Sequence, residues 1–210
     1  MHKSVYSLVL SDGVVQRIDQ MAYARGLSRS ALIDEILAEH ASMVTPQMHA
    51  SSVFEQMERL ICQEGPFQAL HQSAAGLFAV RGVLPVKYRP AVRYQVELHP
   101  QEDGRLGQLK ASFRTQSSSL LRALGLFFQA FMQAESAACS YAEGRFQKEL
   151  RLRRSAVLSA DETAQAISDY IQLVDGALQA FLSLWPDHAA ACQAAARQRA
   201  LYEQGDPLLL

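Results

Sequence analysis

The imidazole and thiol side chains of this chain, which can ligate a metal or act as nucleophiles, belong to six histidines and three cysteines among 210 residues. They are His2, His40, His49, His71, His99, His188, Cys62, Cys139 and Cys192. None of them forms an HxH, HxxxH or CxxC pair, the spacings that bring ligands together on one element. We therefore expect no metal site, no cofactor and reduced thiols.

Motifs for phosphate chemistry and for hydrolysis are also missing. The glycines form neither a P-loop nor a GxGxxG sequence, and the chain contains no GxSxG or HExxH. Two acidic pairs, Asp161-Glu162 and Glu102-Asp103, have plain roles in the first turn of a helix and in a hairpin loop. The sequence predicts a protein that is not an enzyme and has no catalytic residue.

The composition is that of a soluble globular protein, with 49% hydrophobic and 20% charged residues. The net charge is −1, so any binding of nucleic acid has to come from local geometry. The first residues do not form a signal peptide, and the longest apolar run, about 120–132, is interrupted by polar residues and glycine. We expect a cytoplasmic protein that does not enter the membrane.

Three short elements are predicted in the first 42 residues. Residues 3–10 are rich in β-branched and aromatic types, which favours a strand. Ser11 and Asp12 offer caps for a helix that ends at Gly26, and Ser28 caps a second helix. One strand and two short amphipathic helices cannot bury their apolar faces alone. A dimer in which two strands pair and four helices share a core solves this problem.

The segment YSLVLSDGVVQRIDQMAYARGLSRSALIDEILAEH resembles the ribbon-helix-helix (Arc/MetJ/CopG) superfamily of DNA-binding proteins. The resemblance covers residues 3 to about 42. It lies in the strand ending at Leu10-Ser11-Asp12, in the first helix ending at Gly26, and in the Gly26-Leu27-Ser28-Arg29-Ser30 turn. It implies an intertwined homodimer, or a higher oligomer, that inserts a two-stranded ribbon in the major groove of double-stranded DNA.

The resemblance also implies a role for each strand position. Ser4, Tyr6, Leu8 and Leu10 face the core, and Lys3, Val5, Ser7 and Val9 face the bases. Ser28, Arg29 and Ser30 bind a backbone phosphate. Val5 and Val9 are apolar where the family usually has polar residues, which suits contact with thymine methyl groups. Residues 1–40 hold four basic and five acidic residues, so nonspecific affinity should be modest. The alternative is a unit used only for dimerisation.

The rest of the chain is predicted to be a linker, residues 43–52, and a mostly helical domain, residues 53–210. Helical spacing covers 53–62, 67–80, 120–131 and 145–157, and two more helices begin after Ser159, with Glu162 completing a capping box, and after Pro186. Alternating residues at about 92–114 predict a β-hairpin. The expected fold class is mainly α with small β content (α+β).

Three functions compete for this sequence. The first is a transcriptional regulator, a repressor, whose C-terminal domain serves oligomerisation or binds a small-molecule effector or a protein partner. The second is an antitoxin or plasmid-maintenance protein whose C-terminal domain binds a protein partner, and the third is a ligand-binding module or enzyme with an attached dimerisation unit. The basic run Arg145–Arg154 is either a DNA-flanking contact or, more simply, the solvated face of a helix.

Overall fold

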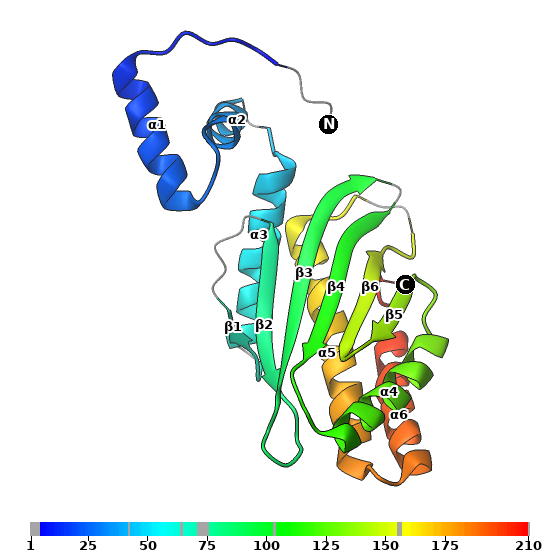
Figure 1. Cartoon of the computed structure of the whole chain (residues 1–210). Helices are drawn as coiled ribbons and strands as arrows, with labels where there is room; N and C mark the ends of the chain where they lie inside the picture. Colours follow the sequence, from blue (N-terminus) through cyan, green and yellow to red (C-terminus); the bar gives the residue numbers. More distant parts are fainter. Residues whose placement is uncertain are drawn as a thin grey trace.

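The fold is built around one antiparallel sheet. The computed structural model describes residues 5–41, 43–63, 65–70, 76–102, 104–154 and 157–209. In these ranges six strands follow the order β1-β2-β3-β4-β6-β5. Their bounds are Gln68–Ala69 (β1), Leu77–Val83 (β2), Ala91–Glu102 (β3), Arg105–Phe113 (β4), Cys139–Ala142 (β5) and Arg145–Arg151 (β6). Figure 1 shows the strands side by side in one curved sheet.

The central strands bury one face of this sheet. In β3 the side chains of Val92, Tyr94 and Val96 are fully buried, and the residues between them are half-exposed. This alternation follows from the period of two in a strand and confirms the predicted hairpin, which here extends from Ala91 to Phe113. A sheet with one wet face needs a single layer of helices to complete the core.

Helices supply that layer on the buried face (Figure 1). They are α3 (Pro46–Glu58), which continues into one π-helical turn (η1, Arg59–Gln63), α4 (Ser118–Gln133), α5 (Ala160–Leu184) and α6 (His188–Gln204). The predicted capping box starts α5: the Ser159 hydroxyl accepts from the Glu162 N–H, and the Glu162 carboxylate accepts from the Ser159 N–H.

Aromatic rings of α4 form the centre of contact between this helix and the sheet. Phe128 stacks on Phe146 of β6, with ring centroids 4.7 Å apart, and on Tyr141 of β5 at 4.6 Å. Phe127 points to the other side and meets Phe181 of α5 at 5.5 Å. The predicted aromatic helix therefore joins the sheet to the helical layer.

Two segments of the body that were predicted as helices contain strands. The prediction of a mostly helical domain with a single hairpin is therefore wrong for these two segments. Residues 67–80, predicted as a helix, contain β1 and the start of β2. Residues 145–157, also predicted as a helix, begin with β6. In β6 the buried residues alternate, whereas in β2 the three successive residues Phe78, Ala79 and Val80 are all buried. In both segments pairing with a neighbouring strand overrides the local helical preference. The predicted linker 43–52 is helical from Pro46, where Thr45 caps α3.

Two helices precede α3: α1 (Asp12–Arg25) and α2 (Arg29–His40), both as predicted. They lie beside one another above the sheet in Figure 1, and α3 leads from them into the body. Gly26 ends α1 with φ 63°, a left-handed conformation that glycine adopts without strain.

Candidate functional site

The turn between α1 and α2 is built as the sequence predicts. The Ser28 hydroxyl accepts a hydrogen bond from the Ala31 N–H at 3.2 Å and so caps α2. Because the first N–H groups of any helix have no partner within it, those of Arg29 and Ser30 are the donors available ahead of α2. This is the geometry that an anionic oxygen uses at a helix N-terminus.

Two ion pairs hold α1 against α2. Arg29 binds both carboxylate oxygens of Asp19 at 2.6 Å, and Arg25 lies 2.8 Å from Glu35. The hydrogen bonds from Arg29 lower the pKa of the Asp19 carboxyl, and Asp19 raises the pKa of Arg29 in turn. The guanidinium expected to bind a phosphate is therefore already paired within the chain, in a bidentate contact on the surface.

The predicted strand at residues 3–10 is not formed in the part that the structure describes. Residues 5–10 have no regular secondary structure, and each of them is exposed. Val5 and Val9 are fully exposed, Ser7 is exposed as well, and Lys3 and Ser4 lie outside the described residues. Leu8 and Leu10, expected in the core, are also exposed. A strand has to pair with another strand, and none of the described strands pairs with residues 5–10.

The helices behind this segment also leave apolar side chains in solvent. Val14 of α1 and Ile36 and Leu37 of α2 are exposed, whereas Ala22 and Leu32 are buried between the two helices. Residues 5–10 and these three side chains are thus apolar groups that stay in solvent in the described structure of the single chain. Exposed apolar patches of this kind are typical of interaction surfaces.

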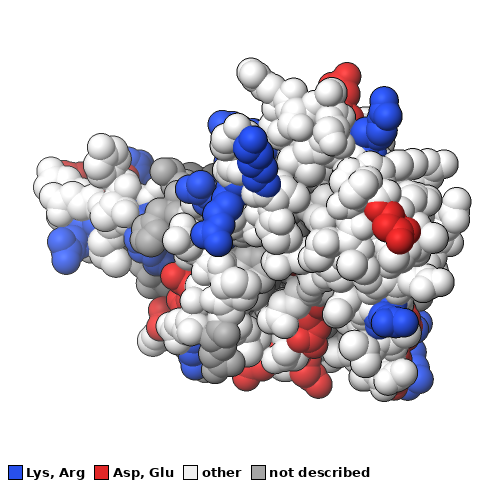
Figure 2. All heavy atoms as spheres, turned by 90° about the horizontal axis from the view of Figure 1, so that it is seen from below, with Lys and Arg blue, Asp and Glu red and all other residues white. Residues whose placement is uncertain are grey.

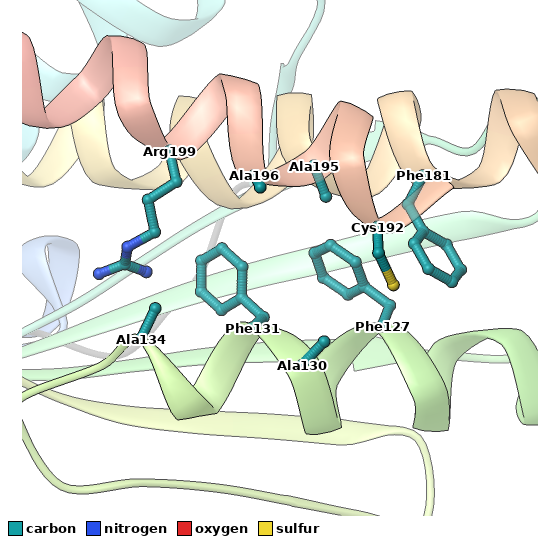
Figure 3. Close-up of a pocket in the computed structure, with 9 residues that line it drawn as sticks. All are labelled: Phe127, Ala130, Phe131, Ala134, Phe181, Cys192, Ala195, Ala196 and Arg199. Carbon is teal, nitrogen blue, oxygen red and sulfur yellow. The ribbon is translucent and has the colours of Figure 1, made fainter. Parts of the chain in front are cut away.

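A pocket lies in the body, between α4 and α6. Its volume is about 290 Å³. Its lining residues are Phe127, Ala130, Phe131, Ala134, Phe181, Cys192, Ala195, Ala196 and Arg199. Figure 3 shows Phe127 and Phe131 rising from α4 toward α6, Cys192 reaching into the space, and Arg199 at one end. Arg199 is the one charged residue among them.

A buried polar cluster adjoins the pocket at Arg199. The Glu135 carboxylate accepts hydrogen bonds from Lys148, from Arg199 and, at 2.9 Å, from the Tyr170 hydroxyl. The side chains of Glu135 and Lys148 are fully buried. Burial, together with the nearby guanidinium groups of Arg199 and Arg153, lowers the pKa of the Lys148 ammonium to about 7.

Sequence reasoning missed Lys148, although a signal for it was present. The basic run 145–154 was interpreted as helical, most simply with its basic residues in solvent, but its first part is strand β6. Phe146, Lys148 and Leu150 alternate with Gln147 and Glu149, a period of two that places Lys148 on the buried face. Glu135 and Arg199 come from other segments, and no local spacing connects them to Lys148.

Other kinds of site find no support in the described ranges. Among the residues searched there, no group of three His, Cys, Asp or Glu side chains could hold a metal ion. No helix in the described part of the chain is long and apolar enough to span a membrane. Figure 2 shows the face seen from below, where Lys and Arg side chains stand at several separate places among scattered acids on a mostly uncharged surface. Charge alone does not make this face a binding site for a polyanion.

Comparison with known proteins returns no match for this chain: no family model, no curated protein and no solved structure corresponds to it. Arguments about function therefore depend on the residues and on their arrangement.

Proposed function

We propose that this chain is a sequence-specific DNA-binding protein, a transcriptional repressor, that acts as a homodimer through its first 42 residues. The observation that carries the proposal is the apolar segment 5–10, exposed at every residue, directly before two well-capped helices. In a ribbon-helix-helix dimer the same segment is the strand that pairs with its copy.

Dimerisation is supported by the apolar surface that the single chain leaves in solvent. Leu8 and Leu10 precede α1, and Val14, Ile36 and Leu37 lie on the two helices. Pairing of two copies of residues 3–10 supplies backbone partners for this strand, and four helices then enclose these side chains. The hydrophobic effect contributes about 25 cal/mol per Å² of apolar surface removed from water, so a surface of this kind favours association.

Recognition of DNA in such a dimer is divided between bases and phosphates. Side chains on the outer face of the paired strands, from Lys3, Val5, Ser7 and Val9, reach base edges, and a two-stranded ribbon fits the major groove. The N-terminus of α2 at Ser28, Arg29 and Ser30 meets a phosphate. Because Arg29 is paired with Asp19, its guanidinium has to leave or share that carboxylate before it can bind a phosphate. The backbone N–H group of Ser30 can bind a phosphate without such a change.

The first test is the oligomeric state. Sedimentation equilibrium of the wild-type chain should give a dimer, and Leu8→Asp should give a monomer because a charge cannot be buried in the shared core without a partner. Leu201→Asp is the matched control, since Leu201 of α6 is 62% exposed against 60% for Leu8. A wild-type monomer, or a Leu8→Asp dimer as stable as wild type, would contradict the ribbon-helix-helix assembly.

The second test is a mobility shift with DNA from upstream of the protein's own gene, with random DNA as competitor. Ser7→Ala should lower specific affinity alone, and Arg29→Ala should weaken all binding and reduce the salt slope by about 1. Asp19→Asn frees Arg29 and should strengthen binding. Ser51→Ala, an exposed serine of α3, is the control. Binding that is unspecific, or indifferent to Ser7 and Arg29, would leave the unit as a dimerisation device only.

The antitoxin alternative requires that the part of the chain after the first 42 residues binds a protein partner. Partner-binding tails of antitoxins are typically short segments that order on binding, because they bury little apolar surface of their own. Here the body contains a sheet with a large buried core that includes Tyr94, Phe128 and Tyr170. This body supports a regulator with a folded second domain.

A further inference from the structure

The pocket between α4 and α6 has the form of a small-molecule site. Its wall is made of three phenylalanine rings and of small side chains, Ala130 and Ala134 near the end of α4 with Cys192, Ala195 and Ala196 on α6. The small residues leave open the space that larger ones would fill. A tightly packed helix pair does not leave such a space, since protein interiors pack as densely as organic crystals.

The size of the pocket limits what it can hold. Its volume of about 290 Å³ is near the lower end of ligand pockets. An engineered apolar cavity of about 150 Å³ holds one benzene molecule. The pocket is therefore large enough for a chain of about eight carbons, or for one aromatic ring with a short side chain. It is too small for a cofactor such as a dinucleotide.

One end of the pocket carries a charged side chain, the guanidinium group of Arg199. The Arg199 side chain is 13% exposed and lies at that end in Figure 3. It shares the Glu135 carboxylate with Lys148, and its other acidic neighbour, Glu203, lies 3.8 Å away and is bound more closely by Arg153 at 2.5 Å.

We propose that this pocket binds a small amphipathic carboxylic acid, with its apolar chain between α4 and α6 and its carboxylate on Arg199. An apolar wall selects the chain, and one guanidinium at the end selects a single negative charge. A guanidinium has five N–H donors, so Arg199 can keep Glu135 and still bind a second carboxylate. The inference goes beyond the proposed DNA binding and does not depend on it.

The chain carries its own reporter for this site. Trp185 is the only tryptophan, and its ring stacks on Phe181 of the pocket wall with centroids 5.8 Å apart. Titration of the full-length protein with octanoate should change the Trp185 fluorescence to saturation. Octanol and octylamine, which have the same chain without the negative charge, should bind at least about tenfold more weakly, because they lose a charge-assisted hydrogen bond to Arg199.

Two variants separate the chain-binding wall from the charged end. Ala130→Phe places a ring in the pocket, leaves the Glu135 ion pairs untouched and should abolish octanoate binding. Ala200→Phe, at an exposed alanine of α6 outside the pocket lining, is its control. Arg199→Gln should weaken octanoate at least about tenfold and leave octanol unchanged, and Arg197→Gln, on the exposed face of α6, should change neither.

Each outcome decides for or against the proposal. Saturable octanoate binding that is lost in Ala130→Phe and weakened in Arg199→Gln supports the site. No saturable binding, equal affinity for octanoate and octanol, or wild-type affinity in Ala130→Phe overturns it. None of these results depends on whether the chain binds DNA, so this inference and the proposed function fail separately.

Discussion

From the contacts of Glu135 we predict that removal of its carboxylate lowers the free energy of unfolding far more than removal of the Lys148 ammonium group. Glu135 accepts from Lys148, Arg199 and Tyr170, and its side chain is fully buried. Glu135→Gln leaves the two cations without a shared anion, and breaking a buried ion pair in this way costs about 3–5 kcal/mol. Lys148→Met leaves Glu135 bound to Arg199 and Tyr170. It replaces the lysine stem with an apolar one of similar length, for a cost of about 0–2 kcal/mol.

The assay is urea unfolding at about pH 6, where Lys148, with a pKa of about 7, is protonated. The free energy of unfolding should fall at least about 2 kcal/mol further in Glu135→Gln than in Lys148→Met. For a chain of this length the larger loss lowers the melting temperature by roughly 6–20 °C. Glu203→Gln is the control, because Glu203 is partly exposed and its loss is screened by solvent.

The lowered pKa of Lys148 also leads to a prediction for the pH dependence of the free energy of unfolding. In the unfolded chain Lys148 has its usual pKa of 10.5, and in the folded chain burial lowers the pKa to about 7. Between these values the unfolded state binds more protons, so this group makes the free energy of unfolding rise as the pH increases from about 7 to about 10.5. Lys148→Met should remove that rise. Equal losses in the two variants, or a pH slope that Lys148→Met does not change, would refute the reasoning.

Two further predictions concern buried groups of the sheet. Tyr94→Phe removes the hydroxyl that donates to Asp175 at 2.8 Å, and it should lower the free energy of unfolding by about 1–3 kcal/mol at neutral pH. Burial raises the pKa of Asp175, so the loss measured in urea should shrink toward about pH 4, as the carboxyl becomes protonated. Gly107→Ala should cost about 3 kcal/mol or more, because φ is 155° and the new Cβ would lie 2.0 Å from the Glu97 carbonyl oxygen. Gly125→Ala in α4, with no atom within 4 Å of its Cβ position, should instead stabilise by about 0.5–1 kcal/mol, and equal effects at the two glycines would contradict this account.

Helices with strong start and stop signals were predictable from local residues. Ser28, Gly26 and the Ser159-Glu162 capping box act within one turn of the helix that they begin or end, so their effect is encoded over a few positions. The hairpin of β3 and β4 was predictable for a similar reason, since its two strands are neighbours in sequence and alternate without interruption.

The strands on either side of this hairpin, β2 and β6, were not predicted as strands. The start of strand β2 and the whole of strand β6 were predicted as parts of helices, because a short segment fits either period until its neighbours are known. β6 pairs with β4 across the whole of α4, and this long-range pairing decides its conformation. The N-terminal segment is the converse case: its sequence favours a strand, yet residues 5–10 have no regular secondary structure and pair with none of the described strands.

The sequence by itself determined the helix ends, the hairpin and the absence of familiar catalytic and metal-binding motifs, because each of these depends on residues a few positions apart. Only the tertiary structure brought Glu135, Lys148 and Arg199 together and left a pocket beside them. These residues come from a loop, a strand and a helix that are distant in sequence. Their burial and their charges act on one another only after the sheet has formed and α4, α5 and α6 have packed on it.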